Sequence, residues 1–187
     1  STGTDVAALA LSGADYTTQV NLNNWTTASQ NIVVNAATTA STASRTIGSL
    51  KLNTAAIASL DIGAGNTLTI NDGANGGGII GVGNFARVIG HATNVGQGSL
   101  TAGTPDDSIN DTLYVYNLQN TTTINNVIRD NNTGSGTDSL HFFAAGNAAT
   151  VTVTANNTYS GGRTVASGVT LAIGANAATH NDGDLGR

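Results

Sequence analysis

The stretch NNTYSGGRTVASGVTLAIG, at residues 156–174, decides the fold class. It places a polar Asn-Asn-Thr-Tyr run before a Gly-Gly pair, followed by two short runs in which apolar residues alternate with other residues. Alternation with a period of two is typical of β-strands, and glycine at the corners suits tight turns rather than a helix. The order predicts two short strands joined by turns. Such a repeat unit indicates a structural role rather than a catalytic one.

The same pattern recurs along the chain and predicts an all-β domain. Alternating segments lie at residues 49–53, 59–63, 67–71, 112–118, 121–128, 139–143, 150–155, 163–167 and 169–174. Regular short strands fit a sandwich, a barrel or a β-solenoid. An aromatic content of only 4% and repetitive medium-sized apolar residues favour the β-solenoid. Three short strands for each rung would need roughly 20–27 residues.

Composition excludes several classes of protein. Charged residues are only 9% of the 187, all eleven acids are Asp, and Lys51 is the only lysine. The chain therefore lacks the Glu and Lys residues that usually cover the exposed faces of helices, which argues against a helical protein. A net charge of −5 with six scattered basic residues argues against nucleic-acid binding. No apolar run approaches the roughly 18 residues of a membrane span, so we expect no membrane insertion by this segment. The absence of cysteine excludes disulfides and thiolate metal sites.

Residues 156–174 resemble the autotransporter-associated β-strand repeat of bacterial surface proteins. The residues that match the repeat are Asn157, Thr158, Tyr159, Gly161, Gly162, Thr164, Val165, Gly168 and Leu171. The departures are Arg163, just before the threonine, and one additional residue before the leucine. The resemblance implies a right-handed parallel β-helix with about three short strands per rung, in the exported passenger region of a longer protein. We therefore expect one domain over residues 1–187, with less regular rungs at 1–45 and regular rungs at 46–187.

The resemblance implies no catalysis, and we expect no enzyme activity, no cofactor and no metal. We predict a structural protein of the bacterial cell surface or extracellular matrix. Neither terminus carries a helical or charged cap, so identical chains could stack head to tail into fibres, or the chain could continue into neighbouring solenoid segments. The alternative is a passenger-type adhesin that binds glycans, through Tyr114, Tyr116 or Trp25, or that binds host or neighbouring cell surfaces. Trp25 could instead plug one end of the core.

A polysaccharide lyase is a further alternative, with Asp106, Asp107, Asp111 and Arg129 as its group of residues. We interpret the three carboxylates as a solvated turn rather than a Ca²⁺ site. The glycine-rich residues 76–90 predict a close-packed strand pair with sharp corners rather than a phosphate-binding loop.

Other possible metal ligands are isolated in the sequence. Asp182 and Asp184 resemble half of a calcium loop and lack its remaining acids. His91, His141 and His180 could converge on zinc, but ordinary polar exposure is the preferred interpretation.

Overall fold

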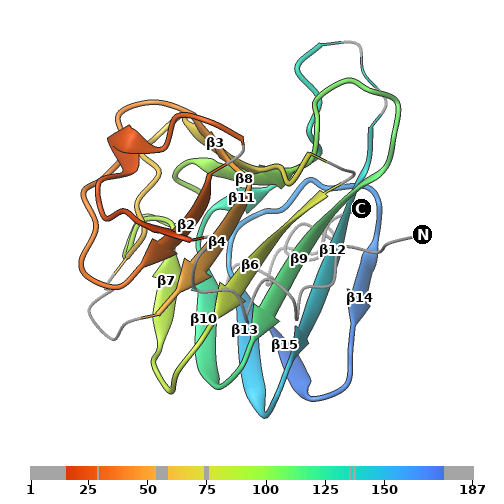
Figure 1. The fold of residues 1–187 in the computed structure, drawn as a ribbon. Coiled ribbons are helices and arrows are strands. Elements are labelled where there is room, and N and C mark those ends of the chain that lie inside the picture. Colours follow the sequence, from red (N-terminus) through yellow and green to blue (C-terminus); the bar gives the residue numbers. More distant parts are fainter. Residues whose placement is uncertain are drawn as a thin grey trace.

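The computed structural model describes residues 16–28, 30–53, 59–73, 76–134, 136 and 138–174 (Figure 1). Their secondary structure is β apart from one three-residue 3-10 helix, η2 at Leu22–Asn24. The strands are β1 (Thr17–Thr18), β2 (Asn31–Val34), β3 (Arg45–Ile47), β4 (Ser49–Leu52), β5 (Thr67–Ile70), β6 (Gly76–Gly81), β7 (Arg87–Ile89), β8 (Ser99–Ala102), β9 (Asp111–Asn117), β10 (Asn120–Ile124), β11 (Val127–Ile128), β12 (Leu140–Gly146), β13 (Ala149–Val153), β14 (Arg163–Val165) and β15 (Val169–Ile173).

The strands form three sheets in which every described strand pair is parallel. The first has seven strands in the order β1-β2-β4-β6-β9-β12-β14. The second has four in the order β15-β13-β10-β7, and the third has four in the order β11-β8-β5-β3. In its middle part the chain visits the sheets in turn, since β9, β10 and β11 belong to the first, second and third sheet before β12 returns to the first (Figure 1).

The expected right-handed parallel β-helix with about three short strands per rung is wrong. The strands divide unequally among three parallel sheets of seven, four and four strands, and the sheets are not a single solenoid. The cause lies in the connecting segments. Residues 35–44 are rich in Ala, Thr and Ser and contribute only an isolated bridge, and residues 154–162 form no strand. Residues 35–44 lack period-two apolar alternation and so present no face that a sheet can bury. In residues 154–162 the alternate side chains of Ala155, Asn157 and Tyr159 are buried, but the segment forms no strand.

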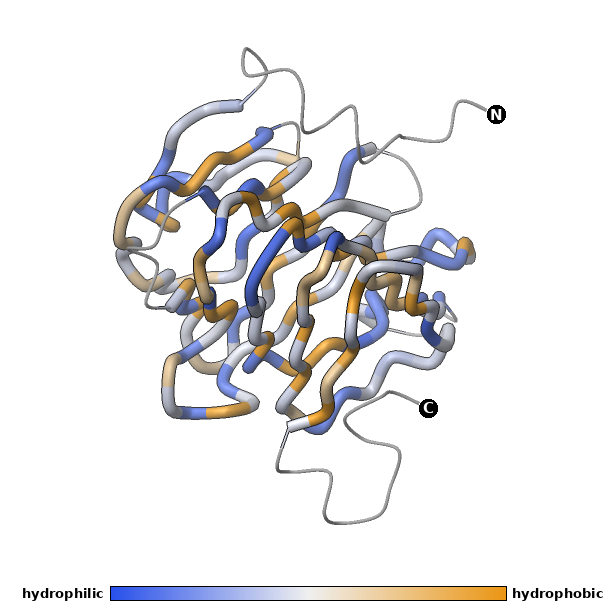
Figure 2. The backbone as a smooth tube through the Cα atoms, turned by 90° about the horizontal axis from the view of Figure 1, so that it is seen from below, coloured by the Kyte–Doolittle hydropathy of each residue, from blue (hydrophilic) through white to orange (hydrophobic). Residues whose placement is uncertain are grey.

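Alternation along each strand sends one set of side chains into a shared core, and Figure 2 shows hydrophobic and hydrophilic positions alternating along the chain. The strand register aligns these buried positions across the seven-stranded sheet, so that each contacts its equivalent on the next strand. One such row runs through Ile32, Leu50, Ile79, Val115, Ala144 and Val165. All except Val165 are at most 2% exposed.

The end of the core nearest β1 is closed by η2. The side chain of Asn21 accepts a hydrogen bond from the Asn23 N–H at 3.0 Å and so caps this helix. Leu22 and Trp25, on either side of the turn, are fully buried and belong to the core. Trp25 therefore has the plugging role that the sequence left open, and its burial excludes it as an exposed platform for glycans.

Candidate functional site

The Asn-Thr-Tyr part of the repeat-like stretch is a structural unit. Asn157 is 2% exposed, and its Oδ1 accepts a hydrogen bond from the Ile128 N–H at 2.7 Å. The Thr158 N–H donates to the Ile128 carbonyl at 2.9 Å. Tyr159 is buried against Phe142, with ring centroids 6.0 Å apart, and this burial raises its pKa to about 12. The side chains of Asn157 and Tyr159 therefore serve packing, and only the Thr158 side chain of this unit is exposed.

The rest of the stretch forms the last strand of two sheets. Thr164 and Val165 lie in β14, which pairs with β12, while Leu171 lies in β15, which pairs with β13. Gly161 lies against the Leu140 backbone, where an added Cβ would come within 2.6 Å of it. The turns before β14 and β15 place Gly162 and Gly168 at positive φ, as the corner interpretation predicts.

The outer edge of β14 and β15 is the first candidate for a functional surface. Val165 and Ile173 face the core side, because their register partners Ala144 and Val153 are buried. Yet Val165 is 46% exposed and Ile173 is 44% exposed. Within the described part of the chain no strand pairs with the far side of either β14 or β15. The two strands therefore present unpaired backbone groups next to uncovered apolar side chains. We call this surface the β14–β15 edge.

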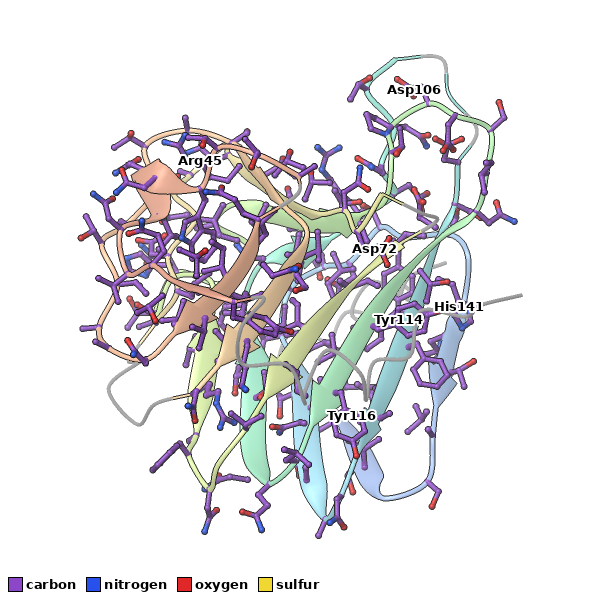
Figure 3. The ribbon with its side chains drawn as sticks, in the orientation of Figure 1. Arg45, Asp72, Asp106, Tyr114, Tyr116 and His141 are labelled. Carbon is purple, nitrogen blue, oxygen red and sulfur yellow. The ribbon has the colours of Figure 1, made fainter. Side chains whose placement is uncertain are left out.

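A second candidate is aromatic and lies on the outward face of the seven-stranded sheet. Tyr114 on β9 and Phe143 on β12 are register partners, with ring centroids 5.5 Å apart. Tyr116 lies two positions along β9, and His141 lies two positions before Phe143 (Figure 3). All four side chains are half-buried.

The proposed acidic group is not assembled on one face. Asp106 is exposed in a projecting loop (Figure 3), where it accepts hydrogen bonds from the Thr133 N–H and hydroxyl. These bonds lower its pKa. Asp111, in contrast, is 1% exposed, so the interpretation of the whole cluster as a solvated turn is wrong for this residue. Arg129 donates to the Thr67 hydroxyl at 3.1 Å. A lyase-type arrangement of these residues is therefore absent from the described structure.

The two histidines in the described residues, His91 and His141, form no shared metal site. His91 Nδ1 accepts from the backbone N–H groups of Thr93 and Asn94 in a local turn. The His141 ring lies 2.8 Å from the Gly161 carbonyl oxygen and 2.9 Å from the Thr164 hydroxyl. Across the described ranges, no three His or Asp side chains are arranged to hold a metal ion. His180, Asp182 and Asp184 lie outside the described residues.

The glycine-rich segment forms two strands, β6 and β7, with a corner between them. The prediction of a strand pair is wrong, because the two strands belong to different sheets. Arg87, which the sequence analysis did not single out, is 1% exposed and donates to the carbonyls of Val82 and Gly83. The loop therefore turns carbonyl oxygens inward, the opposite polarity to a phosphate-binding loop. Arg87 has the same strand parity as buried Ile89, and that parity is the signal that could have located it.

Comparison of the chain with models of known protein families, with curated proteins and with solved structures gives no match. The resemblance of residues 156–174 to the autotransporter-associated repeat stays an expectation. No helix in the described ranges has the length and apolarity needed to cross a membrane.

Proposed function

We propose that this chain is a non-enzymatic structural protein of the bacterial cell surface or extracellular matrix, and that it self-associates through the β14–β15 edge. The observation that carries the proposal is the exposure of Val165 at the end of a row whose other members are buried. A row of register partners in the second sheet shows the same change in exposure at its end. Its members Ile89, Ile124 and Val153 are at most 1% exposed, and the last, Ile173, is 44% exposed.

Covering these side chains would release free energy. Complete burial of a Val or Ile side chain contributes about 1.5–3 kcal/mol, and each of these two is a little more than half covered already. Natural sheets protect open edges with lysine, proline or bulges. Neither β14 nor β15 contains a lysine or a proline. Apart from one exposed charged side chain, Arg163 in β14, the β14–β15 edge thus has the composition of a strand-pairing surface rather than that of a protected edge.

The proposed occupant is a second copy of the chain in a head-to-tail contact. At the opposite end of the seven-stranded sheet, β1 presents Thr17 and Thr18, both exposed, while Leu22 and Trp25 are fully buried nearby. The two ends differ, so the contact joins unlike surfaces and can repeat indefinitely. The cell-surface location rests on the resemblance of residues 156–174 alone.

Sedimentation velocity over a concentration series, combined with electron microscopy, tests the proposal. We expect the purified chain to form elongated assemblies that grow with concentration, and Val165→Lys or Ile173→Lys to reduce them to monomers. Val95→Lys is the matched control, since Val95 is 41% exposed but lies in a turn between β7 and β8. Monomers at every concentration, or assemblies that are equally sensitive to all three substitutions, would contradict self-association through this edge.

The Tyr114–Phe143 pair favours glycan binding as a second candidate function. Sugar rings stack on aromatic faces through their C–H groups, and half-buried rings on a sheet are held in fixed positions. Affinity electrophoresis in gels that contain neutral or acidic polysaccharides would detect such binding. The expected result is retardation of the wild-type chain and normal mobility of Tyr114→Ala. Equal mobility of both proteins in every gel would remove this candidate.

A further inference from the structure

Two buried carboxylates at the start of β9 and before β12 lack the partners that such groups need. Asp111 is 1% exposed, and neither of its side-chain oxygens has a hydrogen-bond partner. Asp138 is 2% exposed, and its Oδ1 also has none. Its Oδ2 accepts from the Asp107 N–H at 3.0 Å. Buried polar groups are almost always hydrogen-bonded, so three unpartnered oxygens on two carboxylates that interact electrostatically require an explanation.

The surroundings of Asp111 are acidic. The charged side chains that act on it are Asp107, Asp138 and Asp72, from the loop before β9, the segment before β12 and the turn after β5. Burial, followed by these negative charges, raises the pKa of Asp111 to about 7. No cationic side chain acts on it within the described residues. A buried charge without a partner of opposite sign costs free energy. The Asp111 carboxylate lacks such a positively charged partner in this part of the chain.

The backbone holds both carboxylates in place. The Asp111 N–H donates to the Ser139 carbonyl at 3.0 Å, which fixes β9 beside the segment that carries Asp138. The Asp111 carboxylate also packs directly on Gly103, where an added Cβ would lie 1.7 Å from Oδ1. The Gly103 carbonyl in turn accepts from the Asn131 side chain at 2.8 Å. These contacts lie at the base of the two loops that project above the sheets in Figure 1.

We propose that a hard divalent cation of the Ca²⁺ class binds to the carboxylates of Asp111 and Asp138 and joins the bases of these two loops. Since no three acidic or histidine side chains in the described structure form a metal site, main-chain carbonyls and water would supply the remaining ligands. Ca²⁺ accepts six to eight oxygen ligands of these kinds in irregular geometry. The proposal is independent of self-association at the β14–β15 edge.

Calorimetric titration and thermal denaturation of the whole chelator-treated chain at pH 8 test the proposal, with CaCl2 as the probe up to about 10 mM, above the range of weak extracellular Ca²⁺ sites. We expect saturable binding of one Ca²⁺ and a rise in Tm. Asp111→Asn should abolish both while the protein remains folded, because the amide removes a buried charge without changing the shape. Asp138→Asn should weaken binding at least tenfold.

The matched control is Asp61→Asn, whose carboxylate already accepts from the Gly63 N–H at 2.9 Å. This variant should bind Ca²⁺ like the wild type. Three results would overturn the proposal. They are no Ca²⁺ binding by the wild type, undiminished binding by Asp111→Asn, or a stability that depends on pH but not on Ca²⁺, which would assign the missing positive charge to a proton.

Discussion

The Asn157 side chain takes the place of a strand beside β11: its Oδ1 accepts from the Ile128 N–H at 2.7 Å, and the next residue, Thr158, donates to the Ile128 carbonyl at 2.9 Å. A segment that forms no strand thereby satisfies both backbone groups of a buried residue. The most specific part of the repeat-like stretch, Asn-Thr-Tyr, thus acts as an edge cover for the third sheet.

Replacing Asn157 with Ala should destabilise the protein by about 1–3 kcal/mol, because the Ile128 N–H would be left buried without an acceptor. Chemical denaturation followed by circular dichroism measures the change. Asn156→Ala is the matched control, since Asn156 is exposed, and it should change the free energy of unfolding by less than about 0.5 kcal/mol. Equal losses in the two variants would show that Asn157 does not act through this bond.

Tyr159→Ala should cost about 3–5 kcal/mol, the usual loss for a buried aromatic side chain, because Tyr159 is 1% exposed and packs against Phe142. Tyr159→Phe keeps the ring and should lose far less. Denaturant unfolding of both variants separates the contribution of the ring from that of the hydroxyl. If Tyr159→Phe is as unstable as Tyr159→Ala, ring packing is not the main contribution.

Gly103→Ala should be more destabilising than Gly65→Ala. Both glycines have positive φ, +81° and +74°, so both substitutions carry the same backbone strain, of about 1 kcal/mol. An added Cβ at Gly65 meets no atom within 4 Å, whereas at Gly103 it would overlap the Asp111 carboxylate. The difference between the two variants in free energy of unfolding measures that overlap. Equal destabilisation would mean that the carboxylate moves aside freely.

The buried Asp111 predicts a stability that falls as pH rises. Its pKa is raised from 3.8 to about 7 in the folded state, so between these values the folded chain holds a proton that the unfolded chain releases. In the presence of chelator, the free energy of unfolding should decrease from about pH 4 to pH 7 and then level off. The full loss is on the order of 4 kcal/mol. Asp111→Asn should remove this slope, and an unchanged slope in the variant would assign it to another group.

Strand positions were largely predictable, because period-two alternation reports directly on a half-buried strand. The segments at residues 67–71, 112–118 and 150–155 coincide closely with β5, β9 and β13. The partition into three unequal sheets was not predictable in the same way. It depends on which connecting segments fail to form strands, and residues 59–63, which alternate in sequence, contribute only an isolated bridge at Leu60.

The candidate sites were also predictable only in part, where strand alternation alone decides which way a side chain points. Asp111 has the strand parity of Leu113 and Val115, so its inward direction could have been inferred once β9 was extended by one residue. The negative charge of Asp138 acts on this carboxylate and no cationic side chain in the described ranges does, which depends on how segments far apart in sequence are placed. The exposure of Val165 could not be predicted from the neighbouring sequence either, because it results from the position of β14 at the edge of a sheet.

Hydrogen exchange of the β14 and β15 amides on assembly tests the central proposal most directly. In a parallel ladder alternate residues bond to the same neighbour. The Ala166 N–H donates to Ala144 and the Gly174 N–H donates to Val153, so the amides of Val165, Val169 and Leu171 point away from the paired strands. We expect these amides to become protected from exchange as concentration rises. Assemblies in which they exchange as fast as in the monomer would contradict the proposal.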